Sequence, residues 1–230
     1  MATTDLTATQ IAFLTAVGKE PELTRQFYWT GGTVLAAEYL HHRISDDIDL
    51  FTEAGLVDLE AITVFLRRVK SNLGYDEFDI QTTFNRNLVF LRLSNGAVLK
   101  TEFTSYPFPR LETATQQRFG VNLDSPKDIA VNKLFTINQK PRGRDYVDLF
   151  FLVETYRYQL HDLMALARIK FDWHIDPIQL GSRLVSPDLS DWPTLVRPLT
   201  QVKLKAFLRE QARQLQDDVF TISDTDQGRG

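Results

Sequence analysis

The chain has 230 residues, a formal net charge of −4 and no cysteine. That length suits one large domain or two small ones, and 43% hydrophobic residues is typical of a folded globular protein. The lack of cysteine excludes disulfide frameworks, thiolate metal sites and cysteine nucleophiles. The acidic balance excludes a protein that coats nucleic acid nonspecifically, so binding of RNA or DNA would need a local basic patch.

The sequence shows no sign of a membrane segment. It has no apolar run long enough to cross a bilayer, and its first ten residues lack the basic and apolar stretches of a secretory signal. We therefore expect a cytoplasmic protein without a membrane partner.

The first half of the chain alternates between helix and strand patterns. Its predicted elements are helices over 5–18, 33–42 and 58–72 and strands over 27–29, 48–51, 78–84, 88–93 and 97–103. Asp58 is a candidate N-cap and Gly74 a candidate stop for the third helix. Asn95-Gly96 predicts a hairpin between the last two strands, with positive φ at both turn positions.

The second half reads as helix and loop. Ser125 is a candidate N-cap and Pro126 suits the first turn of a helix. The predicted helices cover 126–138, 144–157, 160–170 and 201–216. We therefore expect an α+β protein, with a small mixed sheet flanked by helices in residues 1–110, a helical domain in 111–216 and a disordered tail in 217–230.

Residues 29–51 contain a pattern suited to binding a metal and a phosphate. A strand ends in Gly31 and Gly32, a helix follows, and the next strand begins with Asp47 and Asp49. Alternate residues of a strand share a face, so the two carboxylates project together. They would repel each other without a cation, and Mg²⁺ both prefers oxygen ligands and bridges phosphate oxygens. The glycines would let a triphosphate approach the backbone at a helix N-terminus.

A third carboxylate, Glu102, lies on the strand predicted over 97–103, and Lys100 shares its face. Burying an acidic side chain without a partner is costly. Completing a metal site with Asp47 and Asp49 is one reason for an acid at this position. Pairing with Lys100 or with a neighbouring arginine is the other.

The order of a strand, Gly-Gly, a helix, Asp-x-Asp and a later strand carboxylate resembles the polymerase-β-like nucleotidyltransferase fold. Within that fold, GGTVLAAEYLHHRISDDIDLF is similar to the AbiEii/AbiGii toxin family of nucleotidyltransferases, as are DIAVNKLF and RGRDYVDLFFL downstream. The resemblance covers residues 28–155. It implies a nucleotidyltransferase-type sheet, an NTP substrate and the toxin of a toxin–antitoxin pair, with a cognate antitoxin as partner.

The resemblance also implies a role for individual residues in the first half of the chain. Gly31, Gly32 and Thr33 would hold the nucleotide phosphates. Asp47 and Asp49 would bind Mg²⁺ or Mn²⁺, and the third metal ligand would be Glu102.

In the second half, the resemblance implies that Lys133 contacts the triphosphate or neutralises charge in the transition state. Asp145 and Asp148, one helical turn apart, match an acidic pair of the same family. Each assignment has a simpler alternative. Lys133 would then be a solvent-facing helix lysine, and the two aspartates would pair structurally with Arg142 or Arg144.

The implied reaction moves a nucleotide monophosphate from an NTP to an acceptor, with pyrophosphate as the other product. Toxins of this family are associated with tRNA 3′ ends, which makes RNA the leading acceptor. Basic residues that could follow its phosphates are Arg67, Arg68, Lys70, Lys140, Arg142 and Arg144. The alternatives are a catalytically degenerate binding module for nucleotide or a protein partner, and a metal-dependent phosphohydrolase that uses the same carboxylates.

Overall fold

The computed structural model describes residues 6–226, with side chains as far as residue 215. The chain divides into two compact units, Met1–Ser125 and Pro126–Gly230. The division falls at the helix start that the Ser-Pro pair predicts. The α/β unit therefore includes residues beyond 110, where the sequence places the end of the α/β core.

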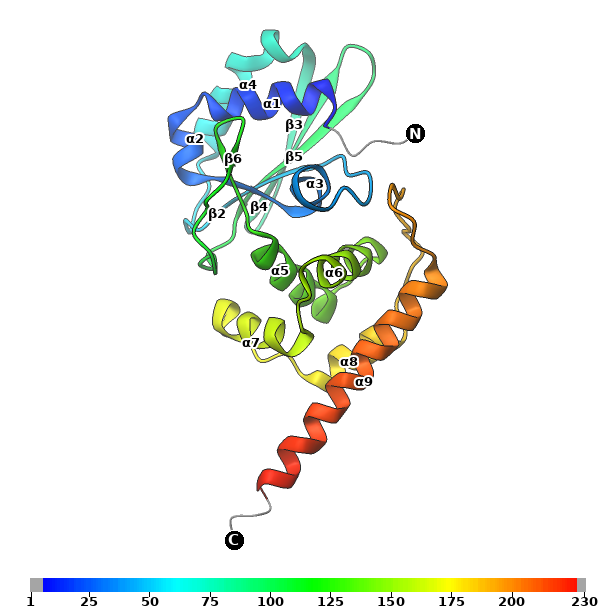
Figure 1. Ribbon diagram of the computed structural model, residues 1–230. Coiled ribbons are helices and arrows are strands. Elements are labelled where there is room, and N and C mark those ends of the chain that lie inside the picture. Colours follow the sequence, from blue (N-terminus) through cyan, green and yellow to red (C-terminus); the bar gives the residue numbers. More distant parts are fainter. Residues whose placement is uncertain (1–5, 227–230) are drawn as a thin grey trace. The chain divides into compact units, whose positions relative to one another are not determined.

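The first unit is built on a seven-stranded mixed sheet with the order β3-β4-β5-β2-β1-β7-β6 (Figure 1). Its strands are β1 (Tyr28–Thr30), β2 (Ile48–Thr52), β3 (Tyr75–Thr83), β4 (Arg86–Leu93), β5 (Val98–Ser105), β6 (Gln117–Arg118) and β7 (Val121–Leu123). β2 is parallel to β5 and β1 is parallel to β7, whereas the other neighbours are antiparallel. This arrangement confirms the predicted α+β class.

Helices accompany this sheet. They are α1 (Ala8–Gly18), α2 (Pro21–Gln26), α3 (Gly31–Val34), the π-helix η1 (Leu35–Leu40) and α4 (Leu59–Leu73). α1 and α4 lie side by side (Figure 1) and pack through an edge-to-face contact of Phe13 and Phe65, with ring centroids 6.2 Å apart. Asp58 caps α4 by accepting a hydrogen bond from the Ala61 amide, and Gly74 ends it with positive φ, as predicted.

Two local predictions need correction. The helix expected from residue 33 begins directly after β1, and its second part is a π-helix that ends at His41 with positive φ. The hairpin loop has three residues, 94–96, because the Leu93 amide donates to the Ala97 carbonyl. Only Gly96 in that loop has positive φ, as in three-residue hairpin loops with one left-handed position.

Alternation along β2 separates the core from the opposite face of the sheet. Ile48 and Leu50 are fully buried, as is Phe103 on the neighbouring β5. Asp49 lies between the two core residues and is partly exposed. The expected division of β2 into an apolar and an acidic face is therefore confirmed.

The second unit is helical. It contains α5 (Pro126–Gln139), α6 (Gly143–Tyr156), α7 (Leu160–Phe171), α8 (Pro177–Val185) and α9 (Gln201–Asp226). α8 was not predicted, although Asp176 caps it and Pro177 occupies its first turn.

The last helix, α9, continues past residue 216, where the sequence places the start of a tail. Extending an existing helix fixes only one further residue at a time, so polar residues alone do not end it. The last part of that expected tail, 227–230, lies outside the described residues. No helix within residues 6–226 has the length and apolar character needed to cross a bilayer.

Candidate functional site

Asp49 lies at the centre of the candidate site because β2 is flanked by β1 and β5. In the strand register, Thr30 of β1 and Glu102 of β5 lie opposite Asp49. Residues directly opposite each other in a sheet share a face. The structure therefore brings two of the predicted carboxylates to one face on adjacent strands.

Gly31 lies against the Asp49 carboxylate. Its φ is +83°, and a Cβ added to it would lie 2.1 Å from Asp49 Oδ2. Any other residue would be strained by the backbone conformation and would also collide with the carboxylate. Glycine here allows the turn between β1 and α3 to approach the acidic face closely.

Gly32 and Thr33 contact the segment 43–47, which precedes β2. A Cβ on Gly32 would lie 2.2 Å from Nη2 of the buried Arg43. The Thr33 hydroxyl donates to the main-chain carbonyl of Asp47 and lies 3.0 Å from Ser45 Oγ. Thr33 is buried, so its hydroxyl positions Asp47 in this structure.

Asp47 is paired with Lys100. Continuing the register from the Ile48–Thr101 pair places Asp47 opposite Lys100, and Lys100 Nζ lies 2.7 Å from Asp47 Oδ2. The side chains are 29% exposed for Asp47 and 32% for Lys100. This ion pair is thus in contact with solvent, which weakens the attraction between its charges.

Glu102 is paired with Arg86 of β4 through two hydrogen bonds. Arg86 Nε lies 2.8 Å from Oε1 and Nη2 lies 2.5 Å from Oε2. The Thr104 hydroxyl also donates to Oε1. The hydrogen bond to Glu102, with the charges of Glu102 and Asp49, raises the pKa of Arg86 against the opposing effect of burial. Glu102 thus adopts the alternative arrangement, in which an acidic strand residue pairs with a neighbouring arginine.

Asp47, Asp49 and Glu102 are not arranged as a three-ligand metal site in this structure. Among the described residues, no group of three or more His, Cys, Asp or Glu side chains is arranged to hold a metal ion. Both oxygens of Glu102 are engaged with Arg86. Asp47 and Asp49 supply the carboxylate oxygens that Mg²⁺ prefers, and Asp49 lies beside Gly31. Their chemistry fits a divalent ion, with Lys100 as a competing cation at Asp47.

Lys133, Asp145 and Asp148 form a cluster within the second unit. Lys133 Nζ on α5 lies 2.7 Å from Asp145 Oδ1 and 2.7 Å from Asp148 Oδ2, both on α6. The aspartate side chains are 0% exposed and the lysine side chain 10%. The reading of Lys133 as a solvent-facing lysine is therefore wrong, and the predicted acidic pair does share one helix face.

Asp145 also caps the start of α6. The Arg142 amide donates to Asp145 Oδ2 at 3.1 Å, and Arg142 Nε lies 3.3 Å from the same oxygen. Burial alone would raise the pKa of Asp145, but the charges of Lys133 and Arg142 outweigh it and lower the pKa. The structural pairing of Asp145 with Arg142 is therefore present, beside its pairing with Lys133.

Sequence reasoning did not name Arg86, and it considered Lys100 as a partner of Glu102, whereas the structure pairs Lys100 with Asp47. The sequence does signal that Lys100 shares the face of Glu102, because it lies two residues earlier. No comparable signal exists for Arg86, because its contact with Glu102 depends on the register between β4 and β5.

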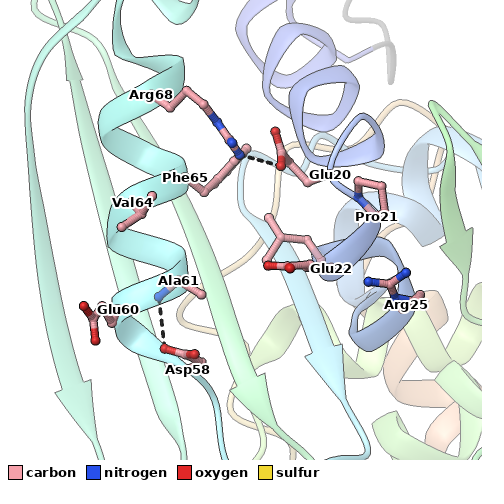
Figure 2. Close-up of a pocket in the computed structure, with 11 residues that line it drawn as sticks. Glu20, Pro21, Glu22, Arg25, Asp58, Glu60, Ala61, Val64, Phe65 and Arg68 are labelled. Atoms are coloured by element: carbon pink, nitrogen blue, oxygen red, sulfur yellow. Dashed lines mark hydrogen bonds and ion pairs between the residues drawn. The ribbon is translucent and has the colours of Figure 1, made fainter.

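A groove of about 570 Å³ lies elsewhere in the first unit, between α2 and α4. Figure 2 shows Arg68 crossing toward its ion-pair partner Glu20, with Val64 and Phe65 on the α4 side. None of the residues predicted to bind metal or nucleotide or to act in catalysis is among the described residues that line it, although Arg68, a candidate RNA contact, does line it. This groove is therefore separate from the carboxylate face.

The sequence profile of the nucleotidyl transferase AbiEii toxin family, of type IV toxin–antitoxin systems, matches residues 12–225. The chain belongs to this family. The AbiEii match extends well beyond residues 28–155, which carry the resemblance. An uncharacterised protein of Aquifex aeolicus (strain VF5), aq_aa25, is 30% identical over 150 residues, which are 65% of this chain and 68% of its own.

Two solved structures share the fold of this AbiEii chain. JHP933 from Helicobacter pylori has a TM-score of 0.58 and 20% identity, covering 96% of this chain and 97% of its own. MenT4, a nucleotidyltransferase toxin from Mycobacterium tuberculosis H37Rv, has a TM-score of 0.58 and 16% identity, covering 92% of this chain and 86% of its own. These similarities confirm the expected nucleotidyltransferase fold.

Proposed function

We propose that this AbiEii chain is an active, Mg²⁺-dependent nucleotidyltransferase. An acceptor hydroxyl oxygen attacks the α-phosphorus of an NTP, the bond to the β-phosphate oxygen breaks, and pyrophosphate leaves while the hydroxyl proton passes to solvent or a base. The observation that supports this most directly is the close approach of Gly31 to Asp49 Oδ2. It puts a main-chain turn suited to phosphates beside an acidic residue suited to a metal ion.

Asp47 and Asp49 are the residues that would hold Mg²⁺ or Mn²⁺. The ion would neutralise charge on the triphosphate as a Lewis acid. Gly31 and Gly32 would admit the phosphates to the backbone, while Thr33 keeps Asp47 in place through the carbonyl hydrogen bond. Each of these contributions is to positioning and charge, which phosphoryl transfer requires more than covalent participation.

Whether Glu102 binds the metal ion depends on its pairing with Arg86. Its two oxygens are bound by Arg86, so it reaches a metal ion only when Arg86 releases it. In the paired state Glu102 holds the Arg86 charge close to Asp49. We therefore assign the metal to the two aspartates first.

The Lys133 cluster provides the second part of the proposal. Lys133 is shared by two buried carboxylates, so a contact with the triphosphate would require it to exchange one of them for a phosphate oxygen. Asp145 and Asp148 would then set its position and its charge. This role is what the family resemblance implies, and the Asp148→Ala variant below tests the structural role of the same cluster.

The acceptor we propose is RNA, with tRNA 3′ ends first, and the partner is a cognate antitoxin. The family description as a toxin of type IV toxin–antitoxin systems supports the antitoxin. A tRNA acceptor would place the protein in the cytoplasm. Of the basic residues considered for RNA, Arg68 and Arg142 are already ion-paired with Glu20 and Asp145.

The decisive experiment incubates the purified chain with each α-labelled NTP, Mg²⁺ and total RNA. Label is expected in RNA, and Asp49→Asn is expected to reduce transfer at least about a hundredfold, because losing even a supporting residue of a metal site costs up to that much. Asp46→Asn is the matched control, since Asp46 is an exposed neighbour of the site. Nucleotide binding without transfer would favour the binding module, and phosphate release without an acceptor would favour the phosphohydrolase.

A further inference from the structure

We infer that Lys100 makes the carboxylate face selective for a metal–nucleotide complex over a free metal ion. This inference rests on the proposed function, because it concerns how the same two aspartates receive their ligands. It starts from the observation that each of two acidic residues on this face is paired with its own cation. Lys100 binds Asp47 and Arg86 binds Glu102.

The two pairs differ in their number of hydrogen bonds and in their exposure. Arg86 donates two hydrogen bonds to Glu102, and the Glu102 side chain is 6% exposed. Lys100 meets Asp47 through a single nitrogen, and both side chains are about one third exposed. An ammonium on a flexible stem reorients more readily than a planar guanidinium held at two points. Lys100 is therefore the exchangeable cation of the face.

The charges then predict a weak site for a free divalent ion. Glu102 is balanced by Arg86, and the charge of the Asp47 carboxylate is already met by Lys100. A divalent ion at Asp47 must share the carboxylate with the Lys100 ammonium, 2.7 Å from Oδ2, or displace it. Like charges this close repel, and solvent contact limits the effect to the scale of a partly exposed ion pair.

The same lysine favours the complex with nucleotide. A divalent ion adds two positive charges beside the Lys100 ammonium, and a triphosphate brings several negative charges that offset them. The Lys100 ammonium has three donors, so it can turn from Asp47 Oδ2 to a phosphate oxygen while the metal ion takes its place at the carboxylate. Lys100 would thus oppose the free ion and assist the metal–nucleotide complex.

Lys100→Gln tests this inference through binding alone. We would measure Mn²⁺ affinity without nucleotide by electron paramagnetic resonance. Calorimetry in Mg²⁺ would give the affinities of the α,β-methylene analogues of ATP, GTP, CTP and UTP. The expected result is Mn²⁺ binding about fivefold tighter and analogue binding about fivefold weaker than in the wild type, the scale of a partly exposed ion pair. Lys100→Arg keeps the positive charge beside Asp47 and is therefore expected to keep the weak Mn²⁺ binding of the wild type.

The opposite changes in Mn²⁺ affinity and analogue affinity separate this role of Lys100 from a structural one. If Lys100 only held Asp47 in place, Lys100→Gln would weaken both affinities, and that result or an unchanged Mn²⁺ affinity would overturn the inference. Lys19→Gln removes the same charge from an exposed position at the end of α1 and is expected to change neither affinity. A wild-type chain that binds neither Mn²⁺ nor any analogue would instead refute the proposed function, with Asp49→Asn as the reference for lost binding.

Discussion

The two units of the chain each contain a lysine bound to aspartate at 2.7 Å, yet the two arrangements differ in kind. Lys100 and Asp47 are about one third exposed, whereas Lys133 lies between two aspartates that are 0% exposed. Solvent can replace either partner of the first pair at little cost. The buried cluster has no such replacement, so breaking it leaves an uncompensated charge. Burial therefore distinguishes a pair that solvent or a ligand can replace at little cost from a cluster in which Lys133 gives up a carboxylate only if another anion takes its place.

The largest expected effect comes from breaking the buried cluster. Asp148→Ala leaves Lys133 with one carboxylate in a site that excludes water, and the free energy of unfolding is expected to fall by about 3–5 kcal/mol. Guanidinium unfolding followed by circular dichroism measures this loss. Glu154→Ala, at an exposed position on the same helix, is the control and is expected to stay within about 0.5 kcal/mol of the wild type. Equal losses in the two variants would show that the cluster contributes little.

Gly31→Ala is expected to affect both stability and transfer. The left-handed backbone at φ +83° costs a non-glycine residue about 1–2 kcal/mol, and the added methyl group also pushes the Asp49 carboxylate away. We expect a lower unfolding midpoint and reduced transfer of label to RNA. Gly55→Ala is the matched control, because nothing lies within 4 Å of a Cβ at that position. Transfer equal to the wild type would argue that the glycine turn plays no part in the site.

The pH dependence of stability tests the buried Lys133 cluster through the pKa of Asp145. The pKa of Asp145 is lowered in the folded chain, so its ionised form is stabilised by folding. That stability is fully present above the unfolded pKa, near pH 4, and is lost as the pH falls toward the lower folded pKa. Unfolding free energies measured from pH 6 downward should therefore decline less steeply in Asp145→Asn. An unchanged slope would mean that Lys133 and Arg142 do not depress this pKa.

The smallest expected change in stability is at the exposed pair. Lys100→Met removes the charge but keeps most of the side-chain stem, and it should alter the free energy of unfolding by no more than about 1 kcal/mol. Thermal unfolding at low and high salt measures the effect, which should shrink as salt screens the pair. A loss as large as that of Asp148→Ala would remove the distinction drawn between the two lysines.

Patterns confined to a few neighbouring residues were readable from the sequence. Alternation put Asp47 and Asp49 on one face of β2 and Ile48 and Leu50 on the other, because successive strand residues point in opposite directions. Asp58 and Gly74 marked the ends of α4 for equally local reasons. The family resemblance also depended on the order of short motifs along the chain, and the profile match confirmed it.

The partners of the charged groups were decided only by the tertiary structure. Arg86 reaches Glu102 because β4 and β5 pair in one particular register, and Lys133 meets Asp145 and Asp148 because α5 packs on α6. The need for glycine at Gly31 likewise arises from the Asp49 carboxylate eighteen positions later in the chain. Spacing along a chain determines which face a side chain occupies, whereas its partner depends on which strands and helices come together in space.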